Sequence, residues 1–216
     1  MSAIDQIEIE ITSKSLLKHP FYQMWSKGEL DREQISGYAK EYFQLVKVVP
    51  QMVRSVASKS TDSAASSSLE QNAREEEGHI ELWTRFALSL GISRSELEAY
   101  SGSAKTRKAV TDLLDLVKNS NFREAASAMY AYEWELPKIS RSKLDGLEKF
   151  YGLTSNDARI YFETHLEADV RHAATWREFL NSENNSTEEN TVRAATQSIE
   201  AQNALLDSVM ESYVTA

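Results

Sequence analysis

Apolar residues recur at helical spacing along almost the whole chain, and few residues that break helices interrupt them. The 216 residues include only seven glycines and three prolines, the two residue types that most disfavour a helix interior. A period near 3.6 residues is typical of helices that bury one face, whereas strands alternate with a period of two. The pattern therefore predicts an all-α fold. We expect helical segments at residues 4–17, 31–59, 62–90, 104–119, 122–151, 155–181 and 187–213.

Short signals in the sequence divide these segments. The aromatic stretch at 19–25 predicts a short helix or turn that ends near Gly28. Pro50 and Pro137 lie inside long helical patterns, and because proline lacks a backbone donor we expect a kink or a break at each. No linker rich in proline or glycine and no change in composition divides the chain, so we expect one domain over residues 1–216.

Composition narrows the classes of function. A formal net charge of -9 argues against a general nucleic-acid binder, which needs clustered Lys and Arg. The absence of cysteine excludes disulfides, thiolate ligands and a cysteine nucleophile, and it is compatible with a reducing compartment. The N-terminal stretch is acidic, and no stretch approaches 18 uninterrupted apolar residues, so we expect no signal peptide and no membrane span. We therefore expect a cytoplasmic protein whose partners are small molecules or proteins.

The stretch FETHLEADVRHA carries the sharpest chemical signal. His165, Asp169 and His172 stand at positions i, i+4 and i+7, so a helix projects all three from one face. An ordinary amphipathic helix would place Leu or Ala on its buried face, but taken alone the triplet is as consistent with a solvated polar face as with a metal site. The same triplet also permits a single zinc ion or a mononuclear iron held by two histidines and one carboxylate.

A second cluster lies in the stretch EEEGH. Glu76 and His79 have the i, i+3 spacing that places a carboxylate beside an imidazole on the helices of dimetal proteins. Glu75, at i, i+4 from the same histidine, lies on the same helical stripe and is an alternative ligand. Glu77 should point away. In isolation the cluster is more typical of a run of surface glutamates beside a chance histidine.

The third element is Glu133, within the apolar and aromatic run AMYAYEW. A buried carboxylate there is costly without a cation or hydrogen-bond partners. A metal would remove that cost, although a tyrosine hydroxyl or a lysine could also satisfy it, and Glu135 is a rival candidate. Three imidazoles and three carboxylates suffice for two six-coordinate ions with positions open to O2, and iron or manganese suits them. The candidate metal ligands are Glu76, His79, Glu133, His165, Asp169 and His172.

Four stretches make the sequence resemble the heme-oxygenase-like dimetal oxidases, among them the chlamydial protein associating with death domains and its bacterial relatives that supply para-aminobenzoate for folate. They are HPFYQMWSKGEL, NAREEEGHIELW, YAYEWELPKIS with Lys143 after it, and YFETHLEADVRHA. The resemblance implies a seven-helix, heme-oxygenase-like (TenA/PqqC-like) bundle and the same six ligands, with Fe/Fe or Mn/Fe as the ion pair. The first carboxylate lies about one helical turn closer to His79 than in those relatives, which leaves both Glu75 and Glu76 open.

The resemblance further implies an enzyme that consumes part of itself. In that family an internal tyrosine is oxidatively cleaved to give the aromatic product and an internal lysine is implicated as the nitrogen source. The matching positions are Tyr22 and Lys143. Tyr132 and Tyr161 are further pocket candidates, and O2 and an external reductant are the expected co-substrates. From the residues alone, a tyrosine in an aromatic cluster is usually core and a lysine is usually solvated.

Other functions stay open from sequence. The same metals could oxidise an external small molecule, or the chain could be an interaction protein that binds death domains, as the family's name suggests. His19 could in principle bind heme, but it precedes Pro20 in an expected turn, and a heme site would leave the three clustered histidines unused. We expect a homodimer from the resemblance, helped by the apolar stripe Ala201, Leu205, Val209 and Tyr213.

Overall fold

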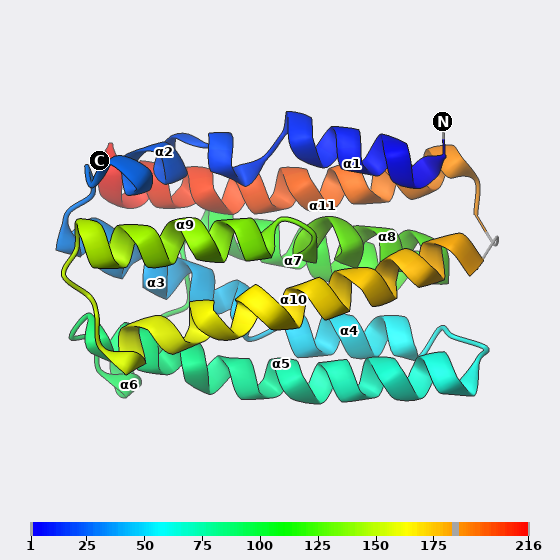
Figure 1. Ribbon diagram of the computed structural model, residues 1–216, viewed down its shortest axis with the longest axis horizontal. Coiled ribbons are helices and arrows are strands. Elements are labelled where there is room, and N and C mark those ends of the chain that lie inside the picture. Colours follow the sequence, from blue (N-terminus) through cyan, green and yellow to red (C-terminus); the bar gives the residue numbers. More distant parts are fainter. Residues whose placement is uncertain (1, 183–185, 216) are drawn as a thin grey trace.

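The computed structural model describes residues 2–182 and 186–215, and within them the regular elements are helices without strands. Helices α5 and α10 are the longest, and most of the long helices run along the long axis of the molecule (Figure 1). The elements are α1 (Ala3–Ser13), the 3-10 helix η1 (Leu16–Lys18), α2 (Pro20–Lys27), α3 (Arg32–Val46), α4 (Val49–Ala57), α5 (Ser63–Ser89), α6 (Arg94–Ala99), α7 (Ala104–Asn119), α8 (Phe122–Glu133), α9 (Leu136–Lys149), α10 (Asn156–Ser182), α11 (Glu188–Val209) and the π-helix η2 (Met210–Val214).

The all-α prediction is confirmed, but the count of seven helices is wrong. Pro50 and Pro137 each end up near the start of a new helix, where the missing backbone donor leaves no hydrogen bond unmade. The expected segments 31–59 and 122–151 are therefore two helices each, which gives nine. The short helix α2 is the element expected at 19–25, and it ends at Gly28 as predicted, whereas the short helix α6 was not expected.

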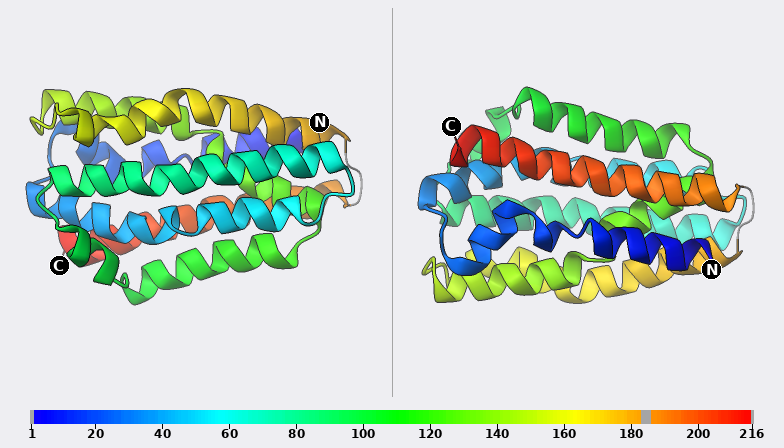
Figure 2. Two further views of the ribbon diagram at one scale, coloured as in Figure 1. Left: turned by 90° about the horizontal axis from the view of Figure 1, so that it is seen from below. Right: turned by 90° about the horizontal axis from the view of Figure 1, so that it is seen from above.

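Helices α5, α8 and α10 meet at the centre of the bundle. α5 and α10 pack against one another and run in opposite directions, while α8 packs against α10 on one side and α11 on the other (Figure 1). Seen from below and from above, α5 with α4 and α11 with α1 lie on opposite sides of this centre (Figure 2). Residues far apart in sequence are thus brought together at one place along the long axis.

The buried face of α5 mixes apolar and polar groups. Leu69, Ala73 and Trp83 join the main hydrophobic core, whereas Glu76 and His79 are buried on the same helix. A surface helix normally places such groups in water, because burying a charge requires a partner. α5 therefore carries a polar strip into the core at the point where it meets α10.

The apolar stripe on the last helix packs inside the chain. Ala201, Leu205 and Val209 are buried, and the ring of Tyr213 lies directly against Gly37, where a Cβ atom would be only 2.3 Å from it. The stripe therefore offers no free surface for a second copy of the chain. The homodimer remains a prediction that rests on the resemblance alone. Among the described residues, the helices are too short or too polar to cross a bilayer.

Candidate metal centre

The six candidate ligands are all buried, although each carries a polar or charged group. Two come from α5, one from the last residue of α8 and three from α10, and none is more than 6% exposed. They are Glu76, His79, Glu133, His165, Asp169 and His172. All six side chains therefore lie in the interior of the bundle.

The side chains converge in two groups that share one carboxylate. Ligand atoms of Glu76, His79 and His165 all lie within 4.8 Å of one another, and those of Glu76, Glu133 and His172 satisfy the same limit. The histidines of α10 thus belong to different groups, instead of forming one three-ligand site with Asp169. Glu76 belongs to both groups, so the arrangement offers two neighbouring three-ligand positions, unlike a single zinc or iron site made by α10 alone.

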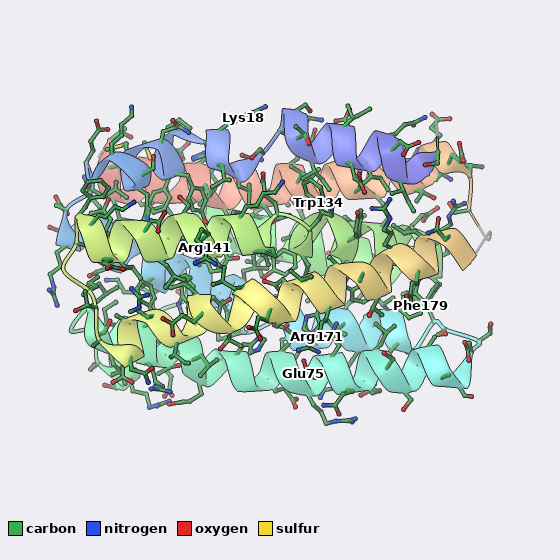
Figure 3. The ribbon with its side chains drawn as sticks, viewed as in Figure 1. Lys18, Glu75, Trp134, Arg141, Arg171 and Phe179 are labelled. Carbon is green, nitrogen blue, oxygen red and sulfur yellow. The ribbon has the colours of Figure 1, made fainter. Side chains whose placement is uncertain are left out.

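Glu75 and Glu76 have distinct positions around one imidazole ring. Oε1 of Glu76 lies 3.4 Å from Nδ1 of His172, on the inner side. Oε2 of Glu75 lies 3.2 Å from Nε2 of the same ring and from Nη2 of Arg171. Figure 3 shows Glu75 and Arg171 facing one another between α5 and α10. Glu76 is therefore placed as the candidate ligand, and Glu75 as the carboxylate that orients the ring.

His165 is held in one tautomer by its own helix. Its Nδ1 lies 2.6 Å from the carbonyl oxygen of Tyr161, so Nδ1 donates a hydrogen and Nε2 is left as the basic nitrogen. The Tyr161 ring also stacks on the imidazole, with centroids 4.0 Å apart. The ring of His79 lies 4.4 Å from that of His165. Burial lowers the pKa of His165 to about 4, which keeps the ring neutral as a metal ligand requires.

Carboxylates crowd the inner end of the site. Nδ1 of His172 lies 3.9 Å from Glu133 and 4.0 Å from Asp169. Oε2 of Glu133 accepts a hydrogen bond of 2.6 Å from Nε1 of Trp176, whereas its Oε1 and Oδ2 of Asp169 have no hydrogen-bond partner. Native proteins rarely leave buried carboxylate oxygens unbonded, so these atoms indicate a ligand position.

The electrostatics of these carboxylates also favour a cation. Burial raises the pKa of Glu133 to about 8, and the charge of Glu76 adds to this effect while His172 opposes it. Burial and the neighbouring charge of Glu133 raise the pKa of Asp169 well above its ordinary value. Two divalent ions would remove this repulsion and use the unbonded oxygens. The three imidazoles and three carboxylates therefore fit a pair of iron or manganese ions.

Tyr22 and Lys143 meet in a separate buried cluster. Nζ of Lys143 lies 4.9 Å from the centroid of the Tyr22 ring. Lys143 is 2% exposed and Tyr22 is 3% exposed. Within residues 2–182 and 186–215, the contacts of the amine are with tyrosine, tryptophan and phenylalanine side chains and include no carboxylate. Burial therefore lowers the pKa of Lys143 well below its ordinary value and favours the neutral amine, which is a nucleophile.

Tyr38 is a functional candidate that the sequence analysis missed. Lys143 Nζ donates a hydrogen bond to its hydroxyl, and its ring stacks on Phe21 beside Tyr22. Its spacing of four residues from Tyr42, another buried tyrosine, was the available signal, since both lie on one face of α3. The Tyr38 hydroxyl contacts the amine directly and can position it.

Aromatic rings connect the lysine cluster with the metal candidates. The Tyr38 ring lies 5.7 Å from that of Trp83, and Trp83 lies 4.7 Å from Tyr161, which stacks on His165. Tyr132 is buried beside Glu133 at the end of α8. The four tyrosine and lysine candidates are therefore all buried, and a series of ring contacts links the Lys143 cluster to His165.

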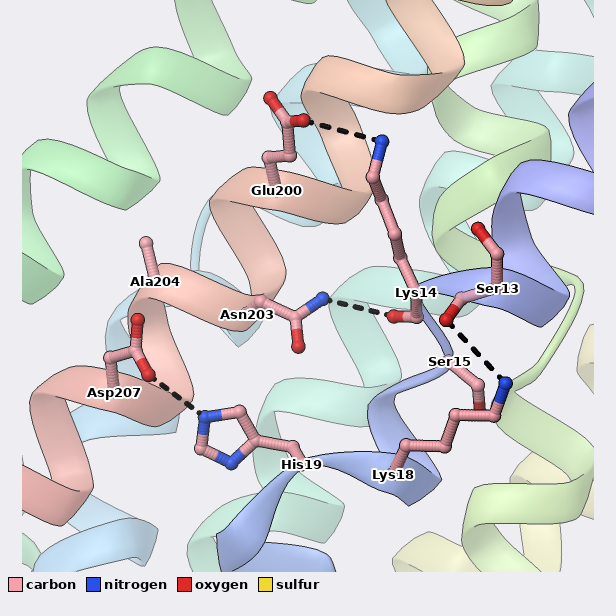
Figure 4. Close-up of a pocket in the computed structure, with 9 residues that line it drawn as sticks. All are labelled: Ser13, Lys14, Ser15, Lys18, His19, Glu200, Asn203, Ala204 and Asp207. Carbon is pink, nitrogen blue, oxygen red and sulfur yellow. Dashed lines mark hydrogen bonds and ion pairs between the residues drawn. The ribbon is translucent and has the colours of Figure 1, made fainter.

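Glu135, the alternative to Glu133, and His19, the possible heme ligand, both have structural partners outside the metal centre. Glu135 accepts hydrogen bonds from Ser15 Oγ, at 2.5 Å, and from the backbone of Leu16. His19 caps α2 by accepting from the backbone of Phe21 and lies 3.0 Å from Asp207. It lines a surface pocket of about 360 Å³ between η1 and α11 (Figure 4). With both ring nitrogens engaged, His19 is poorly placed to bind heme iron.

A second surface pocket reaches the metal candidates. It has a volume of about 270 Å³, and its wall includes Asp169 together with the exposed Val170, Trp134 and Pro137. Apolar groups dominate this wall, and O2 is a small apolar molecule. The pocket therefore brings accessible space to one candidate ligand.

Known proteins resemble this chain over nearly its full length. Residues 6–212 match the TENA/THI-4/PQQC family. A 4-aminobenzoate synthase from Chlamydia muridarum is 32% identical over 215 residues, which cover 98% of this chain and 91% of that protein. A 4-aminobenzoate synthase from Nitrosomonas europaea is 31% identical and covers 96% of this chain and 91% of that protein. The solved TenA homologue from P. horikoshii superposes with a TM-score of 0.82 at 15% identity, covering 98% of this chain and 99% of that one.

Proposed function

Because the chain belongs to the TENA/THI-4/PQQC family, and because relatives over most of its length are 4-aminobenzoate synthases, we propose that it is an enzyme that makes 4-aminobenzoate. We further propose that the aromatic ring comes from Tyr22 and the nitrogen from Lys143. The observation that carries this proposal is the buried contact between the Lys143 amine and the Tyr22 ring.

The product's structure specifies which bonds of Tyr22 have to change. Tyrosine carries a methylene group para to its hydroxyl, and 4-aminobenzoate carries a carboxylate para to its amino group. The bond between Cα and Cβ of Tyr22 therefore breaks, Cα stays in the chain, and Cβ is oxidised to the carboxylate with O2 as the oxidant. A bond between Cζ of the ring and Nζ of Lys143 replaces the phenol C–O bond, whose oxygen leaves as water, and the Cε–Nζ bond of Lys143 breaks with Cε oxidised to an aldehyde. This is a net oxidation that acid–base groups alone cannot perform, and O2 with an external reductant are its co-substrates.

The chain's own residues prepare this chemistry. Glu76, His79, Glu133, His165, Asp169 and His172 would hold two ions, Fe/Fe or Mn/Fe, and the pair would supply the oxidising power with O2. Burial keeps the Lys143 amine neutral, and the Tyr38 hydroxyl fixes its position. The surrounding rings exclude water from the reacting side chains, which limits side reactions.

Isotope labelling tests the source of the product. The chain is made with tyrosine labelled with ¹³C in the ring and lysine labelled with ¹⁵N in the side chain, loaded anaerobically with Fe²⁺ or Fe²⁺ plus Mn²⁺, and given reductant and O2. We expect 4-aminobenzoate that carries both labels, with no aromatic precursor added. Tyr22→Phe should abolish it, whereas Tyr151→Phe, which removes a hydroxyl bonded to the Trp25 carbonyl, should leave it.

The competing functions give different results. If the loaded chain consumes O2 but releases no labelled product, the self-consuming reaction is wrong and an external substrate has to be sought. If the purified chain instead binds a death domain with its candidate ligands replaced, and shows no oxidation, the interaction reading gains support.

A further inference from the structure

A surface pocket lies between the two helices that carry Tyr22 and Lys143. Its volume is about 320 Å³, and its wall is formed by residues of α2 and α9, which pack against one another. A pocket of this size is at the small end of the range for small-molecule sites. The proposed chemistry uses the inner faces of these helices and leaves the pocket without a role. The wall consists of Ser26, Lys138, Arg141, Ser142, Asp145, Gly146, Lys149 and Phe150.

The charges of this wall favour an anion, although the chain as a whole carries a net charge of -9. Its one carboxylate, on Asp145, lies 3.8 Å from Nζ of Lys149. Lys138 lies over the ring of Trp134. Within the described part of the chain, Arg141 on α9 (Figure 3) has neither an ion pair nor a hydrogen bond. A free arginine fork can bind both oxygens of a carboxylate at once, so the pocket has an unused anion-binding group.

Phe150 adds an aromatic surface to the pocket. It is 50% exposed, which is unusual for so large an apolar side chain. The hydroxyl-bearing Ser26 and Ser142 belong to the same wall. An exposed ring beside cations can stack on a flat aromatic ligand while the cations bind its charged group. The wall therefore matches an aromatic carboxylate better than a small inorganic anion, which would not use the ring.

Trp25 connects the pocket with the reacting side chains. Its ring is fully buried and its centroid lies 4.9 Å from Nζ of Lys143. Its Nε1 has no hydrogen-bond partner and lies against Gly146 of the pocket wall, where a Cβ atom would be only 2.3 Å from it. A buried indole N–H normally has a partner. One tryptophan thus contacts both the amine and the floor of the pocket, and it has an unused donor beside that floor.

We propose that this pocket is the site through which 4-aminobenzoate leaves the chain, with its carboxylate bound by Arg141 and Lys138 and its ring against Phe150. The inference rests on the proposed function, because it takes its ligand from that reaction. An ionised carboxylate formed among buried rings is costly to keep there. The cationic wall outside the same two helices offers it a better position. Trp25 lies between the two places, and its unbonded N–H is the donor available to the carboxylate on the way.

Equilibrium binding tests the site itself. The full chain without metal is titrated by calorimetry, at low salt, with 4-aminobenzoate and separately with 4-aminobenzamide, its neutral analogue. We expect the carboxylate to bind at least about fivefold more tightly than the amide, and Arg141→Gln to remove this difference. Arg193→Gln, which changes an exposed arginine on α11, should bind both compounds as wild type does.

Nuclear magnetic resonance locates the ligand within the chain. Each tryptophan indole N–H gives its own signal in a ¹H–¹⁵N spectrum, and Trp25→Phe identifies the signal of Trp25. We expect that signal to move on addition of 4-aminobenzoate, because the ligand lies beside Gly146. The signal of Trp176, whose N–H is bonded to Glu133, should stay in place.

Release of the product tests the route. Ser142→Trp places a large ring in the pocket wall, and Ser66→Trp does the same at a half-buried serine of α5 outside the pocket. After the loaded chain has received reductant and O2, rapid filtration separates free from bound 4-aminobenzoate. We expect Ser142→Trp to form as much product as wild type but to keep a larger share bound, and Ser66→Trp to release it as wild type does.

The outcomes separate this inference from the proposed function. Equal affinities of wild type and Arg141→Gln for 4-aminobenzoate would overturn the inference, as would unchanged release from Ser142→Trp, and the isotope result would stand in either case. If the labelled chain makes no 4-aminobenzoate, the proposed function falls and with it the exit route. A preference for the carboxylate that depends on Arg141 would then still support the pocket as a site for an aromatic carboxylate.

Discussion

Oε2 of Glu75 lies 3.2 Å from Nε2 of His172, the ring whose other nitrogen faces the candidate carboxylate ligands. A carboxylate that bonds the outer nitrogen of a ligating histidine fixes the ring's orientation, and losing such a partner typically costs 10- to 100-fold in metal affinity or activity. We therefore expect Glu75→Gln to weaken binding of Mn²⁺ or Fe²⁺ by about tenfold without unfolding the chain.

The neighbouring residue provides the control for this prediction. Glu77 is exposed and pairs with Arg54 at 2.8 Å, on the outer face of α5. Glu77→Gln should therefore bind metal as wild type does. Equal weakening by both substitutions in a metal titration would contradict a specific role for Glu75.

Tyr161 acts on His165 through its ring and its backbone. A phenylalanine keeps the ring that stacks on the imidazole at 4.0 Å, whereas an alanine removes it. We expect Tyr161→Phe to bind two metal ions as wild type does, and Tyr161→Ala to lose affinity because the imidazole is less well fixed. Equal metal affinities of the Ala and Phe variants would show that the stack is not needed.

Trp176 supplies the hydrogen bond that Glu133 receives at Oε2. Trp176→Phe keeps a buried aromatic ring but leaves both oxygens of that carboxylate without a donor. We expect the free energy of unfolding of the metal-free chain to fall by about 1–3 kcal/mol, beyond the loss of volume. Chemical denaturation measures it, with Trp134→Phe, a partly buried tryptophan, as the comparison. An unchanged unfolding midpoint would contradict the prediction.

The buried amine of Lys143 makes stability depend on pH. Burial lowers its pKa in the folded state, while an unfolded lysine has a pKa of about 10.4. Between these two values the unfolded chain binds more protons, so stability contributed by this group rises with pH and is lost as pH falls from about 10.4 toward the folded pKa.

Removing the amine should remove that dependence. We expect Lys143→Met to be more stable than wild type at pH 7, and the difference to shrink as the pH approaches about 10.4. Lys27→Met, at an exposed position, should follow the wild-type curve. Unfolding free energies of wild type and Lys143→Met that run parallel between pH 7 and 10 would contradict a neutral buried amine.

Helical periodicity explains why so much of the site could be predicted from sequence. A helix fixes which residues share a face, so His165, Asp169 and His172 could be assigned to one inward strip before their surroundings were known. Periodicity does not fix which residues of different helices meet. Only the packing of α5 against α10 places Glu76 inside and Glu75 outside, since both lie on the same stripe.

The missed features have similar causes. Proline signals predicted a disturbance at Pro50 and Pro137, but the choice between a kink and a new helix depends on neighbouring helices. Tyr38 carries an ordinary core side chain in the sequence, and its contact with the Lys143 amine becomes visible only in the structure.

The most direct test of the account is to quantify the small-molecule product and the intact protein mass in the same sample. The chain is loaded anaerobically with iron, or iron plus manganese, and then given reductant and O2 without an aromatic precursor. We predict at most one equivalent of 4-aminobenzoate per chain, with a matching loss of mass at Tyr22 and a change at Lys143. Two bound metals and O2 consumption with no product and no change in mass would contradict it.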